Sequence, residues 1–257
     1  MSLPLAWYLR RMPNPLRIAL YGSGRMGKAI ETIAEERGHT IGLKVDSRNA
    51  GTAPLGCDVA IEFSRPEHAM DNMRICLANR VPVVVGTTGW YDKLNDVKAM
   101  VSQYQGALLW ASNFSIGVNL FFRVNRKLAG LMDKQRDYRV RIDETHHIHK
   151  LDAPSGTAIT LARDIDLKTG RYAGYALEEH GQLQGQEQVQ GPVVIRSERT
   201  GEVTGTHTVT WTGPNDRIVM THEAFDRGGF ALGAVVAAEW IKGRSGLFTM
   251  DDVLDEV

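Results

Sequence analysis

The sequence is poor in cysteine, in net charge and in long apolar runs, and each shortage excludes a class of protein. Cys57 and Cys76 are the only cysteines in 257 residues, so we expect no disulfide scaffold. Thirty basic and thirty acidic residues cancel, whereas proteins that bind nucleic acid or anionic membranes carry clustered positive charge. The N-terminal run LPLAWYL lacks a basic flank and is too short for a signal peptide or a membrane span. These features favour a cytoplasmic globular protein.

From residue 17 onward, short β-type runs alternate with segments of helical period. Helical patterns cover the stretches between these runs, including one over 26–38 and one that Ser64 would cap near Pro66. This alternation predicts an α/β fold with a Rossmann-type, doubly wound parallel sheet. The predicted strands are 17–21, 40–45, 57–63, 81–86 and 107–112.

The pattern changes after Asp137, and an apolar helix over 116–132 leads up to the change. A strand with one wet face is predicted over 138–149, followed by a helix and a Gly- and Gln-rich loop over 170–191. Consecutive antiparallel strands are predicted over 193–201, 203–213 and 216–225. An apolar C-terminal helix should return to the first domain. We therefore expect an additional α+β domain with a mixed or antiparallel sheet.

The segment IALYGSGRMGKAI carries Gly22, Gly24 and Gly27 in G-x-G-x-x-G spacing between a predicted strand and helix. This arrangement is the dinucleotide-binding fingerprint, in which the glycines allow a tight turn and bring the backbone close to a pyrophosphate. Asp46, at the end of the second strand, favours NAD, whereas Arg25 and Arg48 favour NADP, so both cofactors stay open. A turn that serves only packing, or a methyltransferase loop, are the alternatives.

Two more loops follow predicted strand ends, where open α/β sheets bind ligands. One is GTTGW at 86–90 and the other is SNFSIG at 112–117. Both are rich in small residues and hydroxyls, as a nicotinamide-ribose pocket requires. Three such loops at one sheet edge favour a dinucleotide site.

The stretch DETHHIHKLDAPSGTA, residues 143–158, concentrates titratable side chains before a turn. If the strand continued, His147 and His149 would share a face and, with Asp152, could bind zinc, but Lys150 would oppose the ion. The residues could also be surface histidines at a wet strand end. The turn that follows instead predicts an anion site, because N–H groups at a helix start suit a carboxylate. We therefore expect a small dicarboxylate ligand, a proton donor beside it, and no metal.

The stretch HHIHKLDAPSGTA resembles the signature of the 4-hydroxy-tetrahydrodipicolinate reductase (dihydrodipicolinate reductase) family, His-His-x-x-Lys-x-Asp-Ala-Pro-Ser-Gly-Thr, in every element. The segments GSGRMG, VGTTGW, SNFSIGVNL and SGLFTMDDVL extend the resemblance from about residue 16 to the C-terminus. It implies hydride transfer from NADH or NADPH to a cyclic imine dicarboxylate in diaminopimelate and lysine biosynthesis. It also implies a tetramer formed through sheets of the second domain.

The resemblance also implies roles for individual residues. His146 would be the proton donor or acceptor, and Lys150 the proton donor; whether His146 moves a proton or only orients its neighbours stays open. The implied substrate-binding residues are His147, Lys150, Ser155, Gly156 and Thr157. The implied cofactor-binding residues are Gly22, Ser23, Gly24, Arg25, Met26, Gly27, Asp46, Gly86, Thr87, Thr88, Ala111, Ser112, Asn113 and Phe114.

The predicted division of the chain follows from these assignments. We expect a disordered extension at 1–15, a dinucleotide-binding domain at 16–115, a substrate-binding and oligomerisation domain at 116–228, and a returning C-terminal helix at 229–257. The chain departs from the family at Tyr21, where many members have glycine, and in a short segment after Val45 that bears on the adenosine end. The competing readings are a non-catalytic dinucleotide-binding regulator or redox sensor, and a reductase of another small acid.

Overall fold

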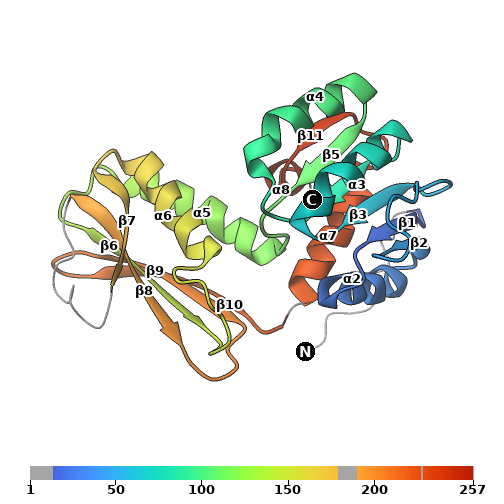
Figure 1. The fold of residues 1–257 in the computed structure, drawn as a ribbon. Helices are drawn as coiled ribbons and strands as arrows, with labels where there is room; N and C mark the ends of the chain where they lie inside the picture. Colours follow the sequence, from blue (N-terminus) through green and yellow to red (C-terminus); the bar gives the residue numbers. More distant parts are fainter. Residues whose placement is uncertain (1–13, 179–189, 227, 257) are drawn as a thin grey trace. The chain divides into compact units, whose positions relative to one another are not determined.

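The computed structural model describes residues 14–178, 190–226 and 228–256, and the chain divides into two compact units (Figure 1). Unit 1 comprises residues 1–116 and 227–257, and unit 2 comprises residues 117–226. The predicted N-terminal extension therefore lies almost wholly outside the described residues. In the part of the chain that the structure describes, no helix has the length and apolar character that crossing a bilayer requires.

Unit 1 is built on a six-stranded sheet in the order β11-β5-β4-β3-β1-β2, and all its strand pairs are parallel. Its inner strands are continuous runs of β-branched and other apolar residues, as in sheets buried on both faces. The strands are β1 (Arg17–Tyr21), β2 (Thr40–Val45), β3 (Val59–Glu62), β4 (Val83–Val85), β5 (Ala107–Trp110) and β11 (Gly246–Phe248).

Helices cover both faces of this sheet (Figure 1). On one face, α2 (Arg25–Glu36), α7 (Gly228–Ile241) and α8 (Met250–Leu254) contribute to one apolar core. On the other, α3 (Pro66–Ala78) and α4 (Leu94–Tyr104), which follows the short 3-10 helix η1 (Tyr91–Lys93), contribute to a second. The predicted Rossmann-type parallel sheet is confirmed. The sequence pattern did not predict the edge strand β11 or the short helix α8.

Unit 2 has a five-stranded mixed sheet in the order β10-β9-β6-β8-β7. Apolar residues of α5 (Ile116–Met132) and α6 (Gly156–Thr169) pack with one face of that sheet into a single core. The predicted α+β architecture with a mixed sheet is confirmed. The strands are β6 (Arg139–His146), β7 (Tyr172–Glu178), β8 (Gly191–Arg199), β9 (Gly205–Thr212) and β10 (Arg217–Ala224).

The prediction of three consecutive antiparallel strands was wrong for the first of them. Strands β9 and β10 form an antiparallel pair, but β8 runs parallel to β6, which lies between β8 and β9. The connection over residues 200–204 passes the end of β6, where the Thr200 N–H donates to the His146 carbonyl (2.9 Å) and the Ile148 N–H to the Gly201 carbonyl (3.2 Å). This crossing ends β6 at His146, three residues earlier than predicted.

Two smaller predictions were also wrong. The loop expected over 170–191 begins instead with β7, which pairs in parallel with β8 as an edge strand, and residues 179–189 lie outside the described part. Ser64 does not cap α3, because its hydroxyl donates to the buried Glu62 carboxylate and Arg65 takes the N-cap position. Pro66 occupies the first turn, as predicted.

Candidate active site

The glycine loop joins β1 to α2 at the carboxyl edge of the unit 1 sheet, where the strand order reverses because β2 and β3 lie on opposite sides of β1. Gly22 has φ +110°, and a Cβ there would lie 2.1 Å from the Phe63 carbonyl oxygen. At Gly27 a Cβ would lie 2.0 Å from the Gly22 oxygen. A Cβ on Gly24 would meet nothing within 4 Å. The first and third glycines are therefore required by the fold, and the second leaves an open cradle at the start of α2.

Polar groups at the end of β2 lie close together. Asp46 accepts hydrogen bonds from the Arg48 side chain and backbone, and these hold the pKa of the Asp46 carboxyl below its usual value. Tyr21 is fully buried, and its hydroxyl donates to the Thr52 carbonyl (2.8 Å) in the short segment after β2. The two departures from the family pattern, Tyr21 and the short segment after Val45, are therefore in contact. The Tyr21 phenol holds that segment against the end of β1.

The loop after β4 supplies a second observation that fits a dinucleotide. Gly86 lies against the Phe63 ring, where a Cβ would come within 2.1 Å. Thr87 is buried, its carbonyl accepts from Trp90 Nε1 (2.7 Å), and its hydroxyl has no hydrogen-bond partner in the described structure. A buried hydroxyl without a partner is costly unless a ligand or water satisfies it. Thr88 is exposed on the same loop.

The loop after β5 is held by a close contact that sequence patterns did not reveal. Phe114 is buried and tilted against Phe63, with ring centroids 5.6 Å apart. A Cβ on Gly233 of α7 would lie 1.7 Å from the Phe114 carbonyl oxygen, so only glycine fits there. Ala111 and Asn113 are half-buried and Ser112 is exposed. With Ser23 and Arg25 exposed and Met26 packed on the core, all the predicted cofactor-binding residues belong to unit 1.

In unit 2, His146 ends β6 and is buried, with its ring 5.0 Å from that of His207 on β9. Gly205 leaves room for this ring, since a Cβ there would lie 3.1 Å from His146 Nε2. Burial lowers the pKa of His146 to about 4, helped by the neighbouring charges of His207, Lys150 and Arg199, with Glu144 opposing them. The imidazole is therefore neutral at neutral pH.

This shift predicts a measurable titration. The unfolded chain binds the His146 proton at about pH 6.5, whereas the folded chain binds it at about 4. Proton binding to the unfolded chain therefore lowers the free energy of unfolding as pH falls from about 6.5 toward 4. The stability that depends on a neutral His146 is fully present above this range and lost below it. The His146 ring proton resonances should titrate near pH 4 by NMR. A titration near pH 6.5 would contradict the buried, neutral ring.

Lys150 and His147 lie in the segment after β6, which is a turn rather than a strand. The Lys150 ammonium is paired with the Asp152 carboxylate at 2.8 and 2.9 Å, and its side chain is 22% exposed. His147 is half-buried and His149 is exposed. His147 and His149 therefore do not share a strand face, contrary to the prediction. The cation instead stands beside a counter-ion that an incoming carboxylate can replace.

The Ser155–Thr157 turn opens α6, as predicted. Ser155 is the N-cap and its hydroxyl accepts from the Ala158 N–H (3.2 Å). The first N–H groups of a helix have no intrahelical partner, so those of Gly156 and Thr157 suit an anion. Gly156 is exposed and Thr157 half-buried, which leaves them accessible. The structure thus brings Lys150, His146 and this turn into one region of unit 2.

Three polar residues behind the turn, two of them buried and Arg199 half-buried, were missed in the sequence analysis. They are Glu144 on β6, Arg199 on β8 and His207 on β9. In the strand register, His207 lies opposite Glu144, and Arg199 lies opposite His146. Burial opposes ionisation of Glu144, but hydrogen bonds from His207, Ser155 and Ser197 outweigh it and hold the pKa of that carboxyl well below its usual range. A signal was present, since Val140, Ile142, Glu144 and His146 alternate on the inward face of one strand.

The cluster supports neither a serine nucleophile nor a metal. Ser155 Oγ lies 3.0 Å from His207 Nε2, but Glu144 also faces Nε2, at 3.5 Å. Among the described residues the opposite ring nitrogen, Nδ1, has no hydrogen-bond partner, whereas a triad requires a carboxylate there. Glu144, His146 and His207 are close enough to share an ion. However, Arg199 already donates to that carboxylate at 3.2 Å, and its fixed positive charge opposes a cation there.

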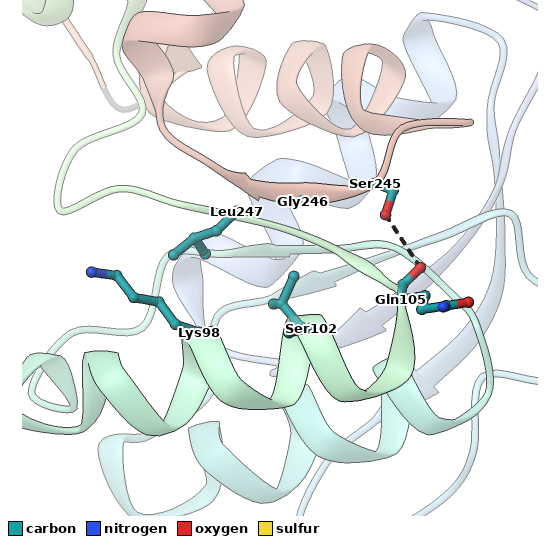
Figure 2. Close-up of a pocket in the computed structure, with 7 residues that line it drawn as sticks. Lys98, Ser102, Gln105, Ser245, Gly246 and Leu247 are labelled. Atoms are coloured by element: carbon teal, nitrogen blue, oxygen red, sulfur yellow. Dashed lines mark hydrogen bonds between the residues drawn. The ribbon is translucent and has the colours of Figure 1, made fainter.

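A surface depression between α4 and β11 is not part of either candidate site. Figure 2 shows it lined by Lys98, Ser102, Gln105 and Leu247, with Ser245 donating to the Gln105 carbonyl (3.3 Å). It is open and lies near the start of β11, whereas the glycine loop lies at the opposite, carboxyl-end edge of the sheet. We assign it no ligand.

The chain matches known proteins along nearly its whole length. The family described as "Dihydrodipicolinate reductase, N-terminus" matches residues 16–114, and "Dihydrodipicolinate reductase, C-terminus" matches residues 117–254. A 4-hydroxy-tetrahydrodipicolinate reductase of Christiangramia forsetii is 45% identical over 94% of this chain and 99% of its own. One of Neisseria meningitidis serogroup A is 32% identical over 94% of this chain and 98% of its own.

A solved structure has the same fold. It is a dipicolinate-bound dihydrodipicolinate reductase from Paenisporosarcina sp. TG-14, with a TM-score of 0.71 and 22% identity over 91% of this chain and 97% of that chain. Together these matches confirm the predicted family and its oxidoreductase class, and the family's dinucleotide-binding half implies a nicotinamide cofactor. The chain belongs to the dihydrodipicolinate reductase (4-hydroxy-tetrahydrodipicolinate reductase) family.

Proposed function

We propose that this protein converts 4-hydroxy-tetrahydrodipicolinate, NADH or NADPH and a proton to tetrahydrodipicolinate, the oxidised cofactor and water, in the diaminopimelate and lysine pathway. The 4-hydroxyl leaves as water, and the hydride reduces the conjugated imine. The observation that carries this proposal is the region of unit 2 where the Lys150 ammonium, the His146 imidazole and the N–H groups of the Ser155–Thr157 turn come together. That combination suits a carboxylated substrate that must gain a proton. The family membership narrows the substrate to the one named in its members.

Unit 1 supplies the cofactor site in this proposal. The open cradle at Gly24 accepts the pyrophosphate at the positive end of α2, and the Thr87 hydroxyl takes a partner from the ligand. Bound nicotinamide supplies the hydride. The remaining cofactor contacts come from residues 22–27, Asp46, 86–88 and 111–114. Residues 16–115 and 229–257 therefore act as the dinucleotide-binding part, and residues 116–228 as the substrate-binding part.

In unit 2, His147, Ser155, Gly156 and Thr157 hold the substrate carboxylates, and Lys150 is the acid. A substrate carboxylate replaces Asp152 beside the ammonium, which leaves Lys150 free to donate a proton to the charge that hydride addition creates. His146 orients and tunes this site, because a ring with a pKa of about 4 carries no spare proton at neutral pH. Fixed donors in a water-poor site contribute several kcal/mol to such charge stabilisation, about 3 for a single donor.

We propose that the protein uses both NADH and NADPH as hydride donors, and that Arg48 determines the kcat/KM for NADPH. The Arg48 side chain is 87% exposed and is paired with the Asp46 carboxylate, a partner that a 2′-phosphate would replace. Arg48→Ala should lower kcat/KM for NADPH by about tenfold and leave kcat/KM for NADH unchanged. Steady-state kinetics with both cofactors measure this. Equal losses for both cofactors would show that Arg48 does not read the phosphate.

We propose that the protein is a cytoplasmic homotetramer assembled through the sheet of unit 2. Its helices α5 and α6 lie on one face, and β10 carries the exposed apolar side chains Ile218 and Val219 near the sheet edge. Sedimentation equilibrium should give four times the 28.5 kDa chain mass. A monomer at micromolar concentration would contradict this assembly.

The proposed activity is tested by following reduced-nicotinamide absorbance while the preceding synthase generates the substrate from pyruvate and aspartate semialdehyde. Substrate-dependent oxidation is expected with at least one cofactor. Binding of NADH and pyridine-2,6-dicarboxylate without any oxidation would favour a regulator or sensor. Faster oxidation with a different small unsaturated acid would reassign the substrate.

A further inference from the structure

Glu144 is a fully buried carboxylate outside the signature motif, and the polar groups around it converge from four segments. Its side chain is 0% exposed. It accepts from the Ser155 N–H (3.0 Å), the Ser197 hydroxyl (2.7 Å) and Arg199 Nη2 (3.2 Å). Burying a carboxylate is unfavourable, because it loses its hydration, unless such partners satisfy it. Its partners therefore point to what it organises.

Arg199 extends this arrangement to the segment that carries Lys150. Its Nη2 donates to Glu144 and also to the Asp152 carbonyl at 2.5 Å. The adjoining Thr200 and Gly201 hydrogen-bond the backbone of His146 and Ile148. The segment over residues 147–154 is thus held at its start and near its end by the end of β8, and the Glu144 carboxylate holds the following residue, Ser155.

As a consequence, some N–H groups of the turn are hydrogen-bonded within the protein and others are available to a ligand. Glu144 takes the Ser155 N–H and the Ser155 hydroxyl takes the Ala158 N–H, so the groups left over belong to Gly156 and Thr157. Glu144 also supplies negative charge between Arg199 and the imidazoles of His146 and His207, which stand 3.6 and 3.5 Å from its Oε2. Without it, these groups and Lys150 would lose the anion at their centre.

We propose that Glu144 and Arg199 are positioning residues: their ion pair fixes the Lys150 segment and the carboxylate-binding turn relative to each other. This inference rests on the proposed function and deepens it. In this proposal the Glu144–Arg199 ion pair contacts neither substrate nor cofactor. Its effect is pre-organisation, because an acid and an anion anchor act together only when their separation is fixed before the substrate arrives.

The test combines Glu144→Ala with a matched control, Glu198→Ala, which removes an exposed carboxylate from the adjacent strand β8. Amide hydrogen exchange at Ser155 should accelerate at least about tenfold in Glu144→Ala, with the amide of Leu161, further into α6, unchanged. Pyridine-2,6-dicarboxylate should bind at least about tenfold more weakly, while the Kd for NADH stays within about twofold. The control should match wild type in all three.

Arg199→Gln provides a second variant if Glu144→Ala fails to fold, since the Arg199 side chain is partly exposed at 19%. It should speed exchange in residues 147–155 and weaken dicarboxylate binding in the same way. Wild-type exchange and wild-type dicarboxylate affinity in a folded variant would overturn the inference. If wild type itself neither binds the dicarboxylate nor oxidises NADH, the proposed function fails, and exchange at Ser155 alone then decides whether Glu144 positions the turn.

Discussion

Replacing Lys150 with alanine is expected to lower kcat by about a hundredfold or more, the usual effect of removing a positioned general acid. The ammonium is the cation nearest to the Ser155–Thr157 turn in the sequence, and the alternative donor, His146, is neutral because of its burial. The variant should still bind NADH as wild type does, because the cofactor residues belong to the other unit. Steady-state kinetics with the synthase-generated substrate, together with NADH fluorescence titration, measure both effects.

Lys168→Ala is the matched control for this result. Lys168 is an exposed lysine in the last turn of α6, on the same unit but at the far end of the helix that Ser155 begins. Its removal should leave kcat within about twofold of wild type, as is usual for a surface substitution. If Lys150→Ala retained more than a tenth of wild-type kcat, Lys150 would not be the acid, and proton transfer would pass to His146 or to water.

Gly24→Val is expected to abolish cofactor binding while leaving the fold intact. The backbone of Gly24 has φ −71° and ψ −168°, which any residue can adopt, and a Cβ there meets no protein atom within 4 Å. The branched side chain would instead occupy the space in which the pyrophosphate approaches the start of α2. We expect the Kd for NADH to rise at least about a hundredfold, with the melting temperature unchanged.

Gly130→Val serves as the control for added bulk at an exposed glycine. Gly130 lies on α5, and a Cβ there also meets nothing within 4 Å. It should leave NADH binding as in wild type. Tight NADH binding by Gly24→Val would mean that the dinucleotide does not approach this loop, and the cofactor assignment in unit 1 would have to be abandoned. Differential scanning fluorimetry and isothermal titration calorimetry measure the two quantities.

The fold of unit 1 was predictable because its strands are short apolar runs with clear breaks between them. β1, β2 and α5 have the predicted bounds. The position of β8 was not predictable in the same way. Its pairing with β6 rather than β9 depends on where the connection over residues 200–204 crosses, and local pattern carries no information on strand order. The edge strand β11 has only three residues, too few for a periodic signal.

The candidate site was predictable where a motif or a turn marks it, and not where long-range pairing builds it. Gly24, Lys150 and Ser155 lie in segments whose spacing alone indicates anion binding or acid–base chemistry. Arg199 and His207 are distant in sequence from that segment, and only the parallel and antiparallel neighbours of β6 bring them to Glu144. The low pKa of His146 likewise depends on burial that sequence does not display.

The most direct test of the central claim is isotope transfer. Wild-type protein would be incubated with synthase-generated substrate and NADH that carries deuterium at both C4 positions of the nicotinamide ring, and the product would be weighed by mass spectrometry. The proposed reaction predicts one deuterium in each product tetrahydrodipicolinate. Product without deuterium, or no product while NADH and the dicarboxylate both bind, would contradict hydride transfer at this site.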